Sequence, residues 1–128
     1  MTLAPSVTLD TSSLIRFATR DDEKKSQKVR NLLKSRQKLY IPDVVFPELE
    51  YVLTKAHGLS RDKLTDFFES LVSLRNLTVN AYIPNAVKLF SRSKLDMADC
   101  IIAAQTSHRN LASFDRQLLK VEGIKSYW

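Results

Sequence analysis

The sequence predicts an α/β layered fold, in which helices flank a mainly parallel central sheet of four to five strands. Short apolar runs alternate along the chain with longer segments whose apolar residues recur every three or four positions. Helical connections favour parallel pairing, because a crossover helix returns the chain to the end of the sheet where the previous strand began. The 128 residues, 44% of them hydrophobic, suffice for one core, so we expect a single domain over residues 1–128.

The first half of the chain predicts two strands and four helices. Acids open residues 21–38 and bases close them, which matches the helix dipole, and Gly58 suits the left-handed end of a helix. The expected elements are, in order, a strand over 7–10, a helix from 11 that carries Leu14, Ile15 and Phe17, a helix over 21–38, a strand over 39–41, and two helices that form a hairpin and begin near Pro42-Asp43 and at Ser60.

The second half repeats the alternation of strand and helix with shorter elements. Ala98, Ile101, Ile102 and Gln105 follow a helical period, whereas residues 110–113 form a brief apolar run. The expected elements are a strand over 77–79, helices over 85–93 and 96–108, a strand over 110–113, a helix from Asp115 to about Val121, and an edge strand over 124–128.

Composition narrows the possible functions. The formal net charge of +6 and the pI near 9.6 favour a polyanionic partner, although many basic proteins have none. One cysteine excludes a disulfide framework and a zinc site built from several thiolates, which indicates a reducing compartment and oxygen ligands for any metal. No basic leader precedes an apolar stretch, and no segment approaches the roughly 20 apolar residues that span a bilayer, so we expect a cytoplasmic protein.

Four carboxylates stand at the edges of apolar runs: Asp10, Glu48, Asp99 and Asp115. Desolvation of a charged carboxylate is costly, so acids placed repeatedly in such surroundings suggest a divalent cation that offsets the cost. In an α/β fold, functional groups gather at the carboxyl ends of the strands. Asp10 and Asp115 lie at or just past such ends, while Glu48 and Asp99 begin helices that can point toward the same crevice.

Each acid also has a structural interpretation. Helix capping explains Asp96 best, and it explains Asp10, Asp99 and Asp115 about as well as a ligand role does. Glu48 is the exception, because apolar residues surround it and a solvated glutamate is expected on the opposite face, where we place Glu50.

The acidic segments resemble those of the PIN-domain ribonucleases, especially the small VapC-type toxins. The resemblance rests on Leu9-Asp10-Thr11-Ser12-Ser13-Leu14-Ile15, Pro47-Glu48-Leu49-Glu50-Tyr51-Val52-Leu53, Leu95-Asp96-Met97-Ala98-Asp99-Cys100-Ile101-Ile102-Ala103-Ala104 and Leu111-Ala112-Ser113-Phe114-Asp115. Any one segment is a weak signal, whereas four in the family's order over nearly the whole chain are a strong one. The resemblance implies a three-layer PIN-like fold and an acidic cluster of Asp10, Glu48, Asp99 and Asp115, without Asp96.

The resemblance further implies a metal-dependent endoribonuclease, the toxin of a type II toxin–antitoxin pair, with RNA as substrate. Relatives of this kind are usually homodimers that a small antitoxin protein inhibits. Three alternatives stay open: a catalytically weak or inactive PIN-like RNA-binding or adaptor module, an RNA-maturation nuclease that is not a toxin, and a phosphoaspartate receiver or phosphatase. The receiver would need a paired acid near Asp10 or a lysine after a late strand, which the acidic segments lack. A maturation nuclease often carries an added zinc module, which this sequence lacks.

Mg²⁺ or Mn²⁺ suits a site made of carboxylate oxygens, and such ions keep several waters with only one or two direct carboxylates. We therefore assign Asp10 and Asp99 as direct metal ligands, and Glu48 and Asp115 as acids that act through water or orient the nucleophile. The hydroxyls of Ser12, Ser113 and Thr11 can fix carboxylate rotamers, although helix capping explains Thr11 better.

Basic residues supply candidate phosphate contacts. Arg16 and Arg116 closely follow acidic segments and are candidate substrate-binding residues. A run of bases also occupies one predicted helix and its exit, where a solvated helix face explains it equally well: Lys24, Lys25, Lys28, Arg30, Lys34, Arg36 and Lys38. Residues of types that bind metals or act as nucleophiles but lack a suitably spaced companion are interpreted as structural, namely His57, His108 and Cys100.

Overall fold

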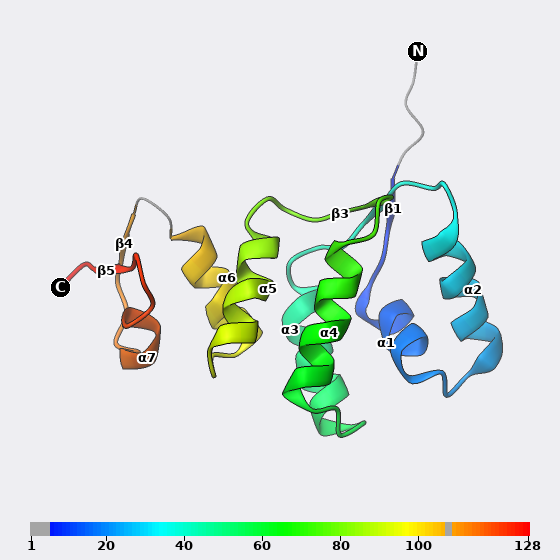
Figure 1. Ribbon diagram of the computed structural model, residues 1–128, viewed down its shortest axis with the longest axis horizontal. Coiled ribbons are helices and arrows are strands. Elements are labelled where there is room, and N and C mark those ends of the chain that lie inside the picture. The colour runs from blue at the N-terminus through cyan, green and yellow to red at the C-terminus, as the bar shows by residue number, and fades with distance from the viewer. Residues whose placement is uncertain (1–5, 107–108) are drawn as a thin grey trace, which may run out of the picture. The chain divides into compact units, whose positions relative to one another are not determined.

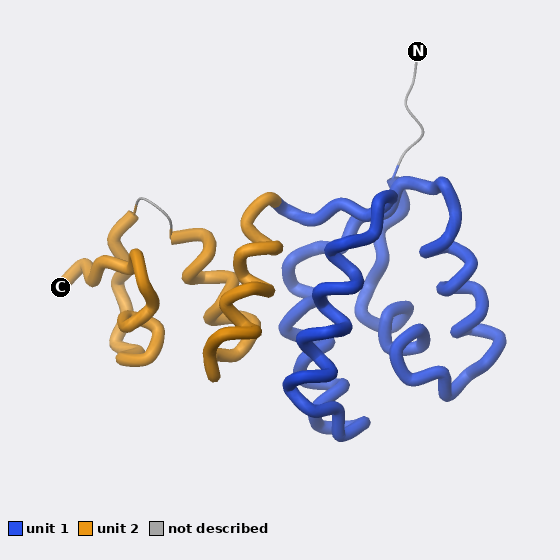
Figure 2. Tube along the Cα trace, viewed as in Figure 1, with its two compact units in different colours: residues 1–80 blue, residues 81–128 orange. Residues whose placement is uncertain are grey.

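The computed structural model describes residues 6–106 and 109–128, which form two compact units, residues 1–80 and residues 81–128 (Figure 2). Each unit combines parallel strands with helices, so the predicted α/β class is confirmed. The expectation of a single domain over residues 1–128 stays a prediction. Within the described residues, none of the helices has the length and apolar character needed to cross a membrane.

Unit 1 is built on a three-stranded parallel sheet in the order β1-β2-β3. Figure 1 labels two of its strands, β1 and β3, and its helices α1 to α4. The strands are β1 (Val7–Thr8), β2 (Leu39–Tyr40) and β3 (Leu77–Thr78). Helices α1 (Thr11–Thr19) and α2 (Glu23–Lys34) connect β1 to β2, and helices α3 (Val45–Lys55) and α4 (Arg61–Val72) connect β2 to β3. These paired crossovers return the chain to the same end of the sheet each time, which is why all three strands are parallel.

Part of the core of unit 1 lies where α3 and α4 contact each other. Phe46 and Phe68 are both fully buried, and their rings meet edge to face with centroids 5.6 Å apart. Leu49 and Leu53 continue the buried stripe of α3 at helical spacing. Gly58, at φ 65°, ends the connection after α3 in the left-handed conformation, and Ser60 caps α4, as the sequence predicts.

Unit 2 begins with a helical hairpin and ends with a small parallel sheet. Helix α5 (Ile83–Arg92) packs against α6 (Met97–Gln105). Strand β4 (Asn110–Leu111), helix α7 (Arg116–Leu119) and strand β5 (Lys125–Ser126) follow, and β4 pairs with β5 in parallel.

The described strands fall in all five predicted segments, but they pair as a three-stranded and a two-stranded sheet rather than as one sheet of four to five strands. Each strand is only two residues long, so its own pattern carries almost no information about its partner. The predicted helix over 21–38 ends at Lys34, because Ser35 turns extended and its hydroxyl donates to the Leu32 carbonyl. The end of the predicted helix over 96–108 includes 107–108, which lie outside the described residues.

Candidate functional site

Asp10 lies at the junction between β1 and α1, where it caps the helix. Its Oδ1 accepts a hydrogen bond from the backbone N–H of Ser13 at 3.0 Å and another from the hydroxyl of Ser12 at 2.9 Å. The Ser13 bond first, and then the Ser12 bond, lower the pKa of the Asp10 carboxyl below its usual value. Asp10 is therefore an exposed, ionised carboxylate whose rotamer is fixed by its neighbours.

Glu48 is exposed, contrary to the expectation that its apolar neighbours shield it. Helix α3 buries Val45 and Leu49, and the period of 3.6 residues turns Glu48 to the flank of that stripe. Two apolar residues on the same flank, Val44 and Tyr51, are exposed too. Glu50, which the sequence pattern predicts to be solvated, is instead half-buried.

Asp10 and Glu48 line the same surface hollow of unit 1. The hollow has a volume of ≈ 710 Å³, and Thr11 and Ser12 also line it. Two segments separated in sequence by α1, α2 and β2 thus bring their carboxylates to one place. His57, interpreted from the sequence as structural, lines this hollow as well. The stop signal at Gly58 predicts where the connection after α3 ends, but it does not predict which residues line a hollow.

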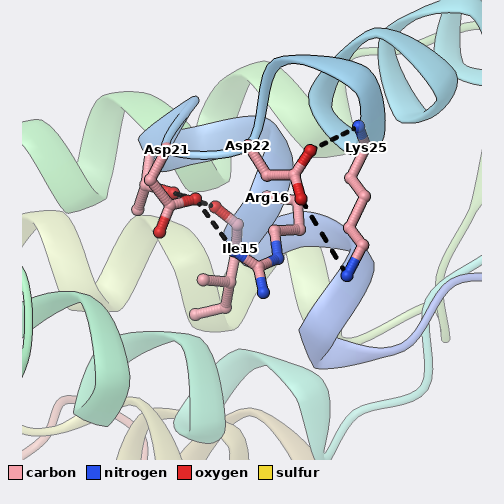
Figure 3. Close-up of polar contacts among 6 residues, drawn as sticks. Ile15, Arg16, Asp21, Asp22 and Lys25 are labelled. Atoms are coloured by element: carbon pink, nitrogen blue, oxygen red, sulfur yellow. Dashed lines mark hydrogen bonds and ion pairs between the residues drawn. The ribbon is translucent and has the colours of Figure 1, made fainter.

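Arg16 also lines the hollow, but its guanidinium is already paired. Figure 3 shows the Arg16 side chain directed at Asp21, with Arg16 Nη1 and Asp21 Oδ1 3.1 Å apart. The Thr19 hydroxyl first, and then Arg16, lower the pKa of the Asp21 carboxyl. A neighbouring pair joins Lys25 Nζ to Asp22 Oδ2 at 4.0 Å (Figure 3). A phosphate that binds Arg16 therefore has to share it with Asp21.

Unit 2 holds the second pair of acids. Asp99 lies in the first turn of α6 and is half-buried, and its backbone N–H donates to Oδ1 of the helix cap Asp96 at 2.8 Å. Desolvation raises the pKa of the Asp99 carboxyl, and the negative charges of Asp96 and Asp115 raise it further. The capping role predicted for Asp96 is confirmed, and Asp99 is an acid whose charge has no nearby compensation among these groups.

Asp115 follows β4 and caps α7. Its Oδ1 accepts the backbone N–H groups of Gln117 and Leu118 at 3.0 and 3.1 Å, and its own N–H donates to the Ser113 hydroxyl at 3.0 Å. Ser113 thus shapes the turn that presents Asp115 rather than bonding its carboxylate. Arg116 is the first residue of α7 and is exposed.

The structure therefore brings the predicted acids together two by two: Asp10 with Glu48 in unit 1, and Asp99 with Asp115 in unit 2. Neither unit, over its described residues, gathers three carboxylate, histidine or cysteine side chains into a metal cluster of its own. The four donors are all carboxylate oxygens, and Asp99 lies in a partly desolvated position where the charges of Asp96 and Asp115 raise its pKa. Both properties fit Mg²⁺ or Mn²⁺, which prefer oxygen ligands and offset such repulsion.

A basic hollow in unit 2 was missed by the sequence analysis. It has a volume of ≈ 620 Å³, and its lining includes Lys88, Arg92, Lys94 and Lys120. Lys88 and Arg92 stand four residues apart on α5 and so share one helix face, which is the signal that could have revealed it. The basic run from Lys24 to Lys38, by contrast, is mostly exposed along α2 and its exit, as a solvated helix face would be. Cys100 is fully buried, and His108 lies outside the described residues.

The comparisons with known proteins match residues in both units of the chain. A family model described as PIN domain matches residues 7–124, which include all four acids. A protein named VapC ribonuclease, from Aquifex aeolicus (strain VF5), is 27% identical over 126 residues, which cover 92% of this chain and 93% of the relative. The chain and this relative therefore correspond over nearly their whole lengths.

Proposed function

Because the chain belongs to the PIN domain family, we propose that it is a metal-dependent endoribonuclease that hydrolyses RNA phosphodiester bonds. The observation that carries the proposal is the pairing of the acids, Asp10 with Glu48 in one hollow and Asp115 close enough to Asp99 to raise its pKa. The activity named for the Aquifex aeolicus relative supports ribonuclease chemistry. Combination of the two pairs into one site rests on the order of the four acidic segments, which resembles the PIN pattern.

Asp10 and Asp99 are the proposed direct ligands of Mg²⁺ or Mn²⁺, with Glu48 and Asp115 acting through water. Asp10 is suited to this role because its hydrogen bonds keep it ionised and fix its rotamer. Asp99 is suited because a bound cation would relieve the repulsion from Asp96 and Asp115. The Ser12 hydroxyl holds Asp10 by donating to the Asp10 carboxylate. The Ser113 hydroxyl holds Asp115 by accepting the Asp115 backbone N–H.

When bound, the ion would polarise the phosphoryl group and lower the pKa of a water nucleophile. The residues of the chain contribute positioning and charge. Glu48, exposed on the flank of α3, is free to accept a proton or a hydrogen bond from a water in the hollow. Arg16 and the basic hollow of α5 offer cations to the RNA backbone, as does exposed Arg116, and such contacts bind without reading sequence.

We further propose that the chain is the toxin of a type II toxin–antitoxin pair, that it acts in the cytoplasm as a homodimer, and that a small antitoxin protein inhibits it. The near full-length correspondence to a protein named VapC ribonuclease supports this assignment over an adaptor module. Retention of all four acids also favours a catalyst. An RNA-maturation nuclease is the alternative that shares the same site.

The test is hydrolysis of single-stranded RNA by the purified chain with Mg²⁺, with Mn²⁺ and with a chelator, alongside Asp10→Asn and Asp99→Asn. We expect cleavage only with the ion, and a loss of at least about 100-fold in either variant, since each removes a ligand charge. Cleavage that survives chelation and both substitutions would contradict the mechanism. Co-purification of a small protein that suppresses cleavage distinguishes a toxin from a maturation enzyme.

A further inference from the structure

Three aromatic rings form an exposed cluster at the end of unit 2, here called the aromatic platform: Phe114, Tyr127 and Trp128. Their exposed fractions are 85%, 66% and 64%. Phe114 and Trp128 stack with ring centroids 5.1 Å apart and planes inclined by 26°, and Tyr127 meets Trp128 edge to face at 5.5 Å. A contiguous exposed apolar patch marks an interaction site more often than scattered exposed side chains do.

The parallel pairing of β4 and β5 places the platform beside Asp115. Phe114 follows β4 and Trp128 follows β5, so both rings stand past the same end of this small sheet. The Tyr127 N–H donates to the Leu111 carbonyl at 2.9 Å and holds the two chain segments together. Phe114 directly precedes Asp115, whose carboxylate is fixed by the first turn of α7. Phe114 and the proposed catalytic acid therefore belong to one turn, and Trp128 reaches that turn by stacking on Phe114.

We propose that the aromatic platform stacks an unpaired base of the RNA next to the phosphodiester on which Asp115 acts. This inference rests on the proposed function, because it assigns a further contact to the same site. Aromatic rings stack on bases of any sequence, since every base offers a π face. Four basic and two acidic residues between 109 and 128 give the surroundings a net positive charge that attracts the RNA backbone.

The size of the platform favours a base over a second protein surface. Three rings of this exposure offer roughly 300–500 Å² of apolar area, whereas a stable protein interface buries about 800 Å² on each partner. A single base covers one exposed ring face. Asp115, which directly follows Phe114, has a proposed role in phosphodiester hydrolysis. In an apolar contact with another protein its charge would only be desolvated.

Trp128 is the only tryptophan in the chain, so its fluorescence reports on the platform directly. The experiment titrates the full chain, in chelator so that no hydrolysis occurs, with a six-nucleotide single-stranded RNA and with an abasic ribose-phosphate oligomer of equal length. We expect the RNA to quench Trp128 and the abasic oligomer to bind more weakly without quenching. Phe114→Ala should weaken RNA binding by about 5- to 150-fold and leave abasic binding unchanged.

Three variants serve as controls. Phe114→Tyr retains a stacking ring and should restore RNA affinity, whereas Phe114→Leu retains apolar area without a π face and should behave like Phe114→Ala. Lys125→Ala removes an exposed charge from β5 and should weaken binding of both oligomers alike, with a salt dependence reduced by about 0.7 in slope. Circular dichroism of each variant checks that the fold is kept.

Equal affinity for RNA and abasic oligomer, or full RNA affinity in Phe114→Leu, would overturn the inference. Trp128 emission that depends on protein concentration without RNA would identify the platform as a contact between copies and overturn it equally. The proposed function is tested separately by hydrolysis with Mg²⁺. Hydrolysis without base-dependent quenching rejects the platform alone, and quenching without any metal-dependent hydrolysis rejects the nuclease while the rings still bind RNA.

Discussion

Asp10 caps α1 and is a proposed metal ligand, and substitutions can separate these two roles. Asp10→Ala removes the bonds from Ser13 and Ser12, at a cost of about 0.5–2 kcal/mol for the lost cap and about 0.3–1 kcal/mol for the lost charge at the helix N-terminus. Asp10→Asn keeps a good capping residue and loses only the charge. At about 4 °C per kcal/mol for a chain of this size, we therefore expect Asp10→Ala, which costs about 0.8–3 kcal/mol in total, to lower Tm by roughly 3–12 °C, and Asp10→Asn to lower it by about 4 °C or less.

The assay combines thermal unfolding with RNA hydrolysis at 25 °C. Both Asp10 variants should lose at least about 100-fold in hydrolysis, since neither supplies a charged ligand. Asp22→Ala is the matched control, because Asp22 caps α2 through the Lys25 N–H and has no role in the proposed chemistry. It should lose comparable stability and keep its hydrolysis. Equal loss of hydrolysis in Asp22→Ala and Asp10→Asn, or full hydrolysis in Asp10→Asn, refutes the reasoning.

Three further predictions follow from the core, from the second acid pair and from the basic hollow. Phe46→Ala removes a fully buried ring packed on Phe68 and should destabilise the chain by about 3–5 kcal/mol in urea unfolding; a loss below about 1.5 kcal/mol contradicts the packing described. The pKa of Asp99 is raised in the folded state by desolvation and like charge, so in the metal-free protein Asp99 holds its proton more tightly when folded, and the stability that this group contributes is lost as pH rises from below 3.8 through the folded pKa. Asp99→Asn lacks this loss, so its stability relative to the unsubstituted chain should increase over that interval, and a constant or decreasing difference contradicts the stated cause. Lys88→Ala and Arg92→Ala should each reduce the slope of log affinity for single-stranded RNA against log salt by about 0.7, and an unchanged slope removes the basic hollow from the RNA path.

Local patterns were sufficient to predict most elements of the fold. Capping residues such as Ser60 and Asp96, and the left-handed Gly58, act through bonds within a few residues, so their effects are readable along the chain. Sheet pairing is different, because β4 and β5 have only two residues each. Which strands pair is decided by how the helices between them pack, and strands this short carry no pattern that predicts it. The sequence therefore predicted the strands and not their division into three and two.

The sequence predicts which residues belong to the candidate site better than it predicts their exposure and contacts. Asp10 caps α1 and Asp99 lies in the first turn of α6, both at recognisable helix starts, whereas the exposure of Glu48 depends on which flank of α3 the core leaves open. Apolar neighbours in sequence do not distinguish the buried stripe from its edge, since a rotation of one residue on a helix is about 100°. The presence of His57 in the hollow and the pairing of Arg16 with Asp21 depend equally on tertiary placement.

The helix caps explain why the acids had two plausible interpretations. Asp10 and Asp115 both accept backbone N–H groups at helix starts, which is the structural role, and the same bonds fix the carboxylates for a ligand role. Capping and metal binding are therefore compatible at these positions. Asp96 and Asp22 are acidic caps without a proposed ligand role.

We propose that Asp10 and Asp99 hold one metal ion, and calorimetric titration of the chain with Mn²⁺ tests this proposal most directly. We expect one ion whose affinity falls in Asp10→Asn and in Asp99→Asn alike, with the double variant little weaker than either single variant, because both changes damage one site. Two ions that respond separately, one to Asp10→Asn and the other to Asp99→Asn, or an ion unaffected by either substitution, would contradict it.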